Sequence, residues 1–129
     1  MIKLVFCARR LPHMSRAEFQ KYWYENHGTM VKKYAAALRI RRYVQVHTLD
    51  HPIQEAFRQS RGGPEAYDGV AELWWDSLDE LMGAATKDPK WQEASLALLE
   101  DEKKFIDLAH SPLWLNNEHV IYSGARVKS

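Results

Sequence analysis

Histidine and tyrosine side chains at helical and strand spacings are the residues in this sequence best suited to acid/base chemistry. His27 lies four residues after Trp23 and four before Val31, so an ionisable ring falls within the apolar stripe expected of a helix. Tyr43 and His47 are four residues apart in a segment that alternates like a strand, and they therefore share one face. An imidazole can transfer protons near neutral pH, and a tyrosine hydroxyl can bind a carbonyl or enolate oxygen.

A third chemical group lies in another segment with a two-residue period, where Asp68, Glu72 and Trp74 share one face. We expect this segment to neighbour the strand that carries His47. A carboxylate beside an imidazole fixes its tautomer and raises its basicity. The spacing therefore predicts that Asp68 or Glu72 orients His47.

Together these side chains give a mechanistic hypothesis. His47 would remove a proton next to a carbonyl, Tyr43 would bind the enolate oxygen, and His27 would return a proton or expel a hydroxide as water. The substrate would be bound by Tyr22, Asp68, Glu72 and Trp74, with Tyr22 and Trp74 as apolar walls. Two alternatives without chemistry remain: a buried histidine bonded to a backbone carbonyl, and a hydrogen-bonded dimer interface.

The remaining polar side chains favour structural roles. No pair of histidines at metal-ligand spacing falls on a predicted helix and there is no cysteine cluster, so a metal site is not expected. Cys7, the only cysteine, is expected to be a small core residue. Asp101 and Glu102 flank the apolar stripe of the last predicted helix, where we expect a pair with Arg9 or Arg10.

Length and composition limit the class of protein. A chain of 129 residues with 46% hydrophobic residues can build one core, and a net charge of +1 gives no broad field for nucleic acid or anionic lipid. The longest stretch without Asp, Glu, Lys or Arg is residues 108–117, which is shorter than the roughly 20 residues of a membrane-spanning helix. We therefore expect no nucleic-acid or membrane partners, and a single cysteine, which cannot form an internal disulfide, favours a cytoplasmic protein.

The elements that position these side chains follow from periodicity and capping signals. Ser15 and Glu18, and again Ser77 and Glu80, form Ser-x-x-Glu capping boxes, each of which opens a helix after a strand. Four segments alternate as strands: Ile2–Arg9, Ile40–Asp50, Tyr67–Asp76 and Leu113–Tyr122. The order β-α-β, β-α-β predicts a ferredoxin-like α+β sandwich with a four-stranded antiparallel sheet.

One domain is expected over residues 1–122, followed by a polar tail at 123–129. Residues 51–66 are predicted to form a loop insertion over the surface, with room for one helical turn at Ile53–Gln59. Gly69 and Ala71 are expected on the helix-packed side of the third strand, because small residues let helices approach a sheet.

The second face of the predicted sheet is too apolar to be left in water. We assign to it Tyr43, Leu49, Val70 and Trp74. A second copy is expected to cover this face, which gives a homodimer with a small-molecule cavity between the two sheets.

Five segments in this order resemble the EthD-like family of the dimeric α+β barrel superfamily. They are Tyr22-Trp23-x-x-x-His27-x-x-x-Val31, Arg42-Tyr43-Val44-Gln45-x-His47, Tyr67-Asp68-Gly69-Val70-x-Glu72-Leu73-Trp74, Asp101-Glu102-x-x-Phe105 and Glu118-His119-Val120. The resemblance implies the same fold and dimer, but not one reaction. Superfamily relatives include cofactor-independent muconolactone isomerases, polyketide cyclases and dehydratases, as well as haem proteins and accessory proteins.

The leading functional hypothesis is a cofactor-independent lyase, isomerase or cyclase. It would act on a small oxygenated compound, aromatic or polyketide-derived, by histidine acid/base chemistry in the cavity. The first alternative is a non-catalytic protein that binds a small molecule or serves another enzyme. A second alternative is haem binding through His27 or His47, which only the resemblance suggests.

Overall fold

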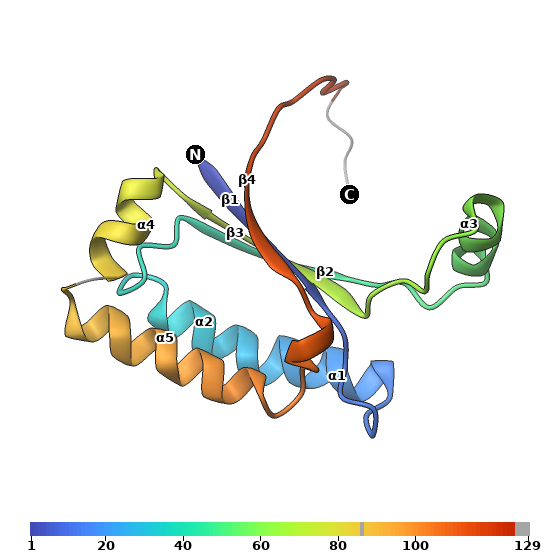
Figure 1. The fold of residues 1–129 in the computed structure, drawn as a ribbon, viewed down its shortest axis with the longest axis horizontal. Coiled ribbons are helices and arrows are strands. Elements are labelled where there is room, and N and C mark those ends of the chain that lie inside the picture. The colour runs from blue at the N-terminus through green and yellow to red at the C-terminus, as the bar shows by residue number, and fades with distance from the viewer. Residues whose placement is uncertain (86, 126–129) are drawn as a thin grey trace.

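Four antiparallel strands form one sheet, with helices packed on a single face (Figure 1). In this computed structural model, which describes residues 1–85 and 87–125, the strand order is β2-β3-β1-β4. The strands are β1 (Ile2–Ala8), β2 (Arg42–His47), β3 (Gly69–Trp75) and β4 (Leu113–Asn117). This arrangement confirms the predicted α+β ferredoxin-like fold.

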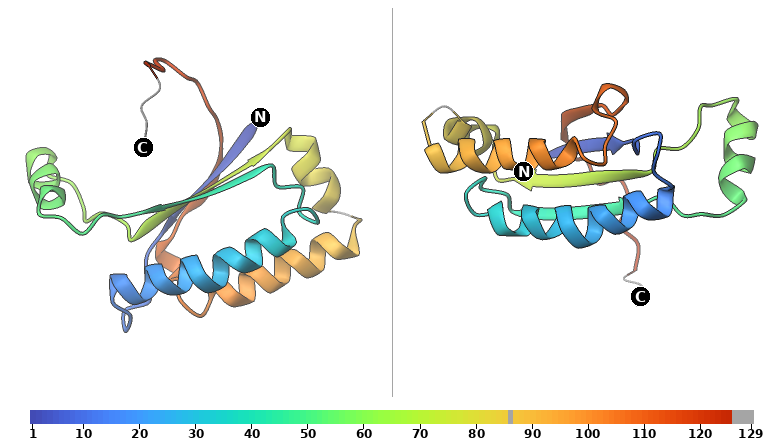
Figure 2. Two further views of the ribbon diagram at one scale, coloured as in Figure 1. Left: turned by 180° about the vertical axis from the view of Figure 1, so that it is seen from behind. Right: turned by 90° about the horizontal axis from the view of Figure 1, so that it is seen from below.

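Two helical segments, called the two helical layers below, lie side by side on that face of the sheet (Figure 2). The first runs without a break through α1 (Arg16–Tyr22), the π-helix η1 (Trp23–His27) and α2 (Gly28–Tyr34). The second consists of α4 (Leu78–Ala85) and α5 (Pro89–Glu102), and a 3-10 helix, η2 (Leu108–His110), precedes β4. Ser15 and Glu18 form the expected capping box at the start of α1.

Aromatic side chains fill the space between these helices and the sheet. Phe19, Trp23 and Phe105 belong to one buried cluster with Ala71 of β3. A Cβ atom on Gly69 would lie 2.4 Å from the Trp23 ring, so only glycine admits this indole. The predicted helix-facing position of Gly69 and Ala71 is therefore confirmed.

The segment between β2 and β3 projects beyond the end of the sheet (Figures 1 and 2). It contains a nine-residue helix, α3 (Ile53–Arg61), which is longer than the single turn expected at Ile53–Gln59. Gly62, with a left-handed φ of 63°, ends it. None of the residues of α3 is buried, because the helix projects beyond the end of the sheet.

The last strand is shorter than predicted. Pairing with β1 ends at Asn117, whereas the apolar pattern suggested a strand as far as Tyr122. The side chain of Glu118 still contacts Lys3 and Trp74 of the sheet, and residues 119–125 continue away from it (Figure 1). Of the predicted tail at 123–129, residues 126–129 lie outside the described part of the chain.

The strand register corrects the expected division of side chains between the two faces. Tyr43 is opposite Leu73, and Arg42 is opposite Trp74. Tyr43 therefore faces the helices and Trp74 lies on the open face, so the expectation that they share a face is wrong. A register that differs by one residue exchanges the faces of a whole strand, and alternation within each strand does not fix it. Leu49 lies beyond the end of β2.

Candidate active site

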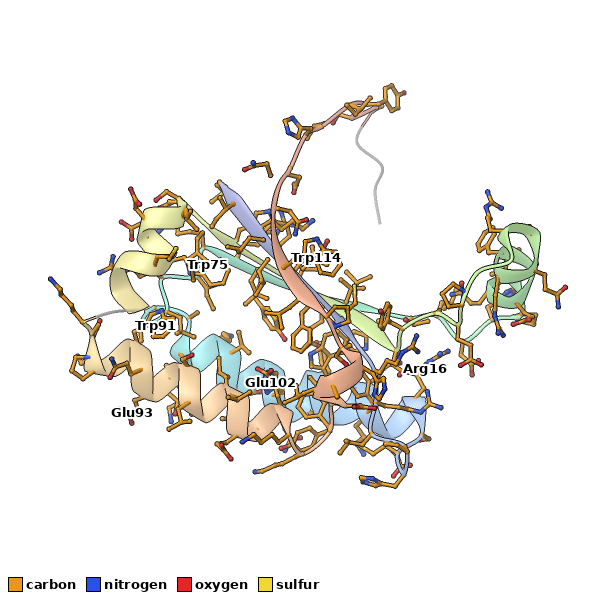
Figure 3. The ribbon with its side chains drawn as sticks, in the orientation of Figure 1. Arg16, Trp75, Trp91, Glu93, Glu102 and Trp114 are labelled. Atoms are coloured by element: carbon orange, nitrogen blue, oxygen red, sulfur yellow. The ribbon has the colours of Figure 1, made fainter. Side chains whose placement is uncertain are left out.

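A cavity of about 600 Å³ lies between the helices and the helix-facing side of the sheet. Its walls are mostly aliphatic and aromatic, and Trp75 and Trp91 line it toward the α4 end (Figure 3). Glu102 extends into this layer from α5, where His27 and Tyr43 also line the cavity. We expected the cavity between the sheets of two copies, but this one lies within a single chain.

His27 is held by a buried carboxylate on the other helical layer. Its Nδ1 atom lies 2.8 Å from Oδ2 of Asp101, and Oδ1 of Asp101 accepts a hydrogen bond of 2.6 Å from the Tyr22 hydroxyl. Burial raises the pKa of Asp101, but the hydrogen bonds from Tyr22 and His27 outweigh it, so the pKa is lowered and the group is a carboxylate. A carboxylate only accepts, and Nδ1 of His27 must therefore donate.

This contact leaves the other ring nitrogen of His27 as a base. Burial lowers the pKa of His27 more than Asp101 raises it, so the ring is neutral near pH 7. A neutral imidazole that carries its proton on Nδ1 has a free lone pair on Nε2. The π-helical turn places this ring against the buried Phe105 ring, at 5.1 Å between centroids.

Glu102 supplies an acid beside this base. Its Oε2 atom lies 4.0 Å from Nε2 of His27. Burial, followed by the charge of Asp101, raises the pKa of Glu102 to about 7. Near neutral pH the cavity therefore holds an imidazole base next to a carboxyl group that can still carry its proton.

His47 lies outside this cavity. Its ring stacks on Trp23 at 4.7 Å between centroids, and its Nε2 lies 2.8 Å from Oε1 of Gln45. It lines a separate groove between α2 and the β2 edge of the sheet. Tyr43 and Val31 line both hollows, so Tyr43 is the predicted strand residue that reaches the cavity with His27.

The two carboxylates that were predicted to bind substrate lie away from the cavity. Asp68 is buried and paired with Arg10 at 2.6 Å and with Arg16 at 3.0 Å. Glu72 lies on the open face of the sheet, 2.7 Å from Lys3. None of the carboxylates predicted to orient His47 contacts it, and that expectation is wrong.

Two aromatic residues also differ from their expected roles. Trp74 stacks with cations of Lys3 and Arg42 on the open face, away from the cavity. Tyr22 donates a hydrogen bond to Asp101 and is not an apolar wall of the cavity. Burial, and after it the Asp101 carboxylate, raises the pKa of Tyr22 to about 12. It remains a hydrogen-bond donor throughout the physiological pH range.

The sequence interpretation missed the roles of Asp101 and Glu102. Arg10, one of the arginines expected to pair with them, binds Asp68 instead. Glu102 lies four residues after Leu98 and three before Phe105, so it falls within the apolar stripe of α5. The same reasoning that selected His27 from its helical stripe would have selected this carboxyl group.

The described residues show no group of three or more histidine, cysteine, aspartate or glutamate side chains that could hold a metal ion. Over residues 1–85 and 87–125, no helix is both long and apolar enough to cross a membrane.

Helices on one face of a four-stranded antiparallel sheet, in this strand order, define a ferredoxin-like α+β protein. Residues 11–109 match the EthD domain, and the chain belongs to the EthD family. No curated protein matches the sequence.

Several solved structures share the fold. An EthD-like protein from Ralstonia eutropha JMP134 is 18% identical over 95% of each chain, with a TM-score of 0.61. A dimeric protein with a ferredoxin-like fold from Bacteroides fragilis NCTC 9343 is 11% identical, over 91% of this chain and 95% of that one, with a TM-score of 0.58. SnoaB from Streptomyces nogalater, described as a cofactor-independent oxygenase, is 14% identical over 92% of this chain and 93% of its own, with a TM-score of 0.53.

Proposed function

We propose that this protein is an enzyme that uses His27 and Glu102 for acid/base catalysis on a small oxygenated compound in the cavity. The proposal rests on one observation: a neutral imidazole, with its lone pair free, lies 4.0 Å from a carboxyl group whose pKa is about 7. Paired groups with displaced pKa values in an apolar cavity are typical of general acid/base sites.

In this proposal each group has one role. Nε2 of His27 removes a proton next to a carbonyl, and Asp101 stabilises the imidazolium that forms. The Tyr43 hydroxyl donates to the enolate oxygen. Protonated Glu102 then delivers a proton to another carbon in an isomerase, to the carbonyl oxygen left negative when the enolate carbon bonds to that carbonyl carbon in a cyclase, or to a departing hydroxide in a lyase. Each step uses only groups of this chain.

His27 replaces His47 as the proposed base. The Nε2 atom of His47 is engaged with Gln45, and the Trp23 ring lies against its imidazole. By contrast, Nε2 of His27 lies 4.0 Å from Glu102, and both residues line the cavity. A general base must reach the proton that it removes, and this requirement favours His27.

The walls of the cavity favour an aromatic or polyketide-derived substrate. A volume of about 600 Å³ lies within the range of small-molecule sites, and Trp23, Trp75 and Trp91 offer flat apolar surfaces. The fold shared with the cofactor-independent oxygenase supports the view that it can host chemistry without a cofactor.

Proton exchange tests this function without knowledge of the natural substrate. A panel of aryl ketones and β-diketones in D₂O is followed by NMR for loss of the α-proton signal. We expect the protein to accelerate exchange of at least one compound, and His27→Gln to lower this acceleration by about 10²- to 10⁴-fold. His13→Gln, at an exposed histidine, is the matched control.

Two results would count against catalysis. Equal exchange with His27→Gln would remove His27 as the base. Tight binding of these ketones without any acceleration would favour the alternative, a binding or accessory protein, to which the mostly apolar cavity is equally suited.

We also propose that the protein is a homodimer through the open face of the sheet. Val46, Val70 and Cys7 form one row across three strands of this face, and none is buried within the chain. The Bacteroides fragilis protein with the same fold is described as dimeric. A second copy would shield this apolar row from water.

A further inference from the structure

The side-chain amide of Gln45 joins three groups beside the cavity. Its Nε2 atom lies 2.9 Å from the carbonyl oxygen of Trp23 and 2.7 Å from the hydroxyl of Tyr43. Its Oε1 atom lies 2.8 Å from Nε2 of His47. Gln45 therefore connects the π-helix to two side chains of β2, those of Tyr43 and His47.

The donor and acceptor at each end of this amide follow from chemistry. A backbone carbonyl only accepts hydrogen bonds, so the atom of Gln45 that faces the Trp23 carbonyl must be the NH₂ group. Gly28 makes this approach possible, because a Cβ atom there would lie 3.1 Å from Nε2 of Gln45. The oxygen of Gln45 then faces His47, whose Nε2 must carry a proton and donate it.

The same reasoning determines what Tyr43 does with its hydroxyl proton. One hydrogen of the Gln45 amide goes to the Trp23 carbonyl, and the other goes to the Tyr43 oxygen. Burial raises the pKa of Tyr43 to about 12, against hydrogen bonds from Gln45 and from the Trp23 side chain, which lower it. The Tyr43 oxygen thus accepts from Gln45, and its own proton points to a further acceptor.

We propose that Gln45, held by Trp23 and His47, is a positioning residue that fixes Tyr43 as a hydrogen-bond donor to an oxygen of the substrate. This inference deepens the acid/base function proposed above and rests on it. It requires that the substrate carry a carbonyl or phenolic oxygen that becomes negatively charged during the reaction. Donors arranged before the reaction stabilise such an oxyanion without reorganisation.

A pair of aromatic probes tests the direction of this relay. 2-Naphthol, bound as naphtholate at a pH above its solution pKa, presents an oxyanion, whereas naphthalene has the same rings without oxygen. Gln45→Glu keeps the shape but replaces the NH₂ group by an acceptor, so Tyr43 must donate to residue 45 instead. We expect Gln45→Glu and Tyr43→Phe each to weaken naphtholate binding about 10-fold or more, and to leave naphthalene binding unchanged.

Gln92→Glu, at an exposed position of α5, controls for the added charge. Equal weakening of both probes would show a merely structural role for Gln45 and overturn the inference. Unchanged naphtholate affinity in Gln45→Glu, or failure of the wild-type protein to bind either probe, would also overturn it.

Nitrogen NMR of the free protein gives a second measurement that needs no ligand. The inference requires that the neutral His47 ring carry its proton on Nε2, and a proton on Nδ1 would reverse the relay and overturn it. This failure is distinguishable from failure of the acid/base function, since loss of exchange in His27→Gln does not depend on Gln45.

Discussion

His27 and Asp101 are 74 residues apart in the sequence and are joined by a buried hydrogen bond of 2.8 Å between Nδ1 and Oδ2. The bond connects the π-helical turn of the first helical layer to the end of α5 in the second. Because Tyr22 occupies the other oxygen of Asp101, the carboxylate is satisfied on both sides. The contact thus fixes the spacing of the two layers and the tautomer of the imidazole at once.

Asp101→Asn tests the structural part of this contact. The folded-state pKa of Asp101 is lowered, so its stabilisation is complete above the pKa of the unfolded chain and is lost as pH falls through the folded pKa. We expect the variant to lose about 1–3 kcal/mol in the free energy of unfolding at pH 7, and progressively less at acid pH. Urea unfolding at pH 7 and pH 3 measures the difference. Asp79→Asn, an exposed carboxylate on α4, should change neither value, and an equal loss at both pH values would contradict the assignment.

Glu102→Gln tests the acid of the His27–Glu102 pair, for which the change of stability with pH has the opposite sign to that of Asp101. The folded-state pKa is raised to about 7 from an ordinary value of 4.5, so the folded chain binds more protons between these values. Stability of the normal protein should therefore fall as pH rises from 4.5 to 7, by at most roughly 3 kcal/mol. The glutamine variant lacks this loss and should gain stability relative to the normal protein between pH 5 and pH 8.

Glu93→Gln is the control for this comparison, since Glu93 points away from the cavity on the same helix (Figure 3). Parallel stability curves for the normal protein and Glu102→Gln between pH 5 and pH 8 would show that Glu102 titrates as an ordinary carboxyl group.

Gly69→Ala tests the close approach of η1 to the sheet. The new methyl group would meet the Trp23 ring at 2.4 Å, so the buried indole would have to shift to admit it. Overpacking of this kind costs about 1–3 kcal/mol. Gly83→Ala, where a Cβ atom meets nothing within 4 Å, is expected to stabilise α4 by up to about 1 kcal/mol. Equal denaturant midpoints for the two variants would contradict this packing.

The sequence was sufficient for the order of the main helices and strands but not for the mutual register of the strands. Capping at Ser15 and the alternation around Tyr43 are local signals, and the helix and strand that they predict are present. Which strand faces coincide depends on pairing between distant segments, and the one-residue difference that separates Tyr43 from Trp74 has no local signature. The same distinction between local signals and distant contacts applies to the candidate site. His27 stands out within its own helix, whereas its partner Asp101 is set by how two helices pack.

Val70→Lys tests the proposed dimer. Val70 lies opposite Cys7 on β1 and Val46 on β2, at the centre of the apolar row on the open face. Within one chain Val70 is only half-buried, so a lysine can extend its ammonium group into water and the fold should survive. In a dimer through this face the same ammonium group would be buried without a partner, which is costly. We expect a dimer for the normal protein and a folded monomer for Val70→Lys in sedimentation at micromolar concentration.

Leu96→Lys, which removes an exposed leucine of α5 on the opposite side of the sheet, should remain a dimer. A normal protein that sediments as a monomer, or a Val70→Lys variant that still dimerises, would show that this face is not the interface.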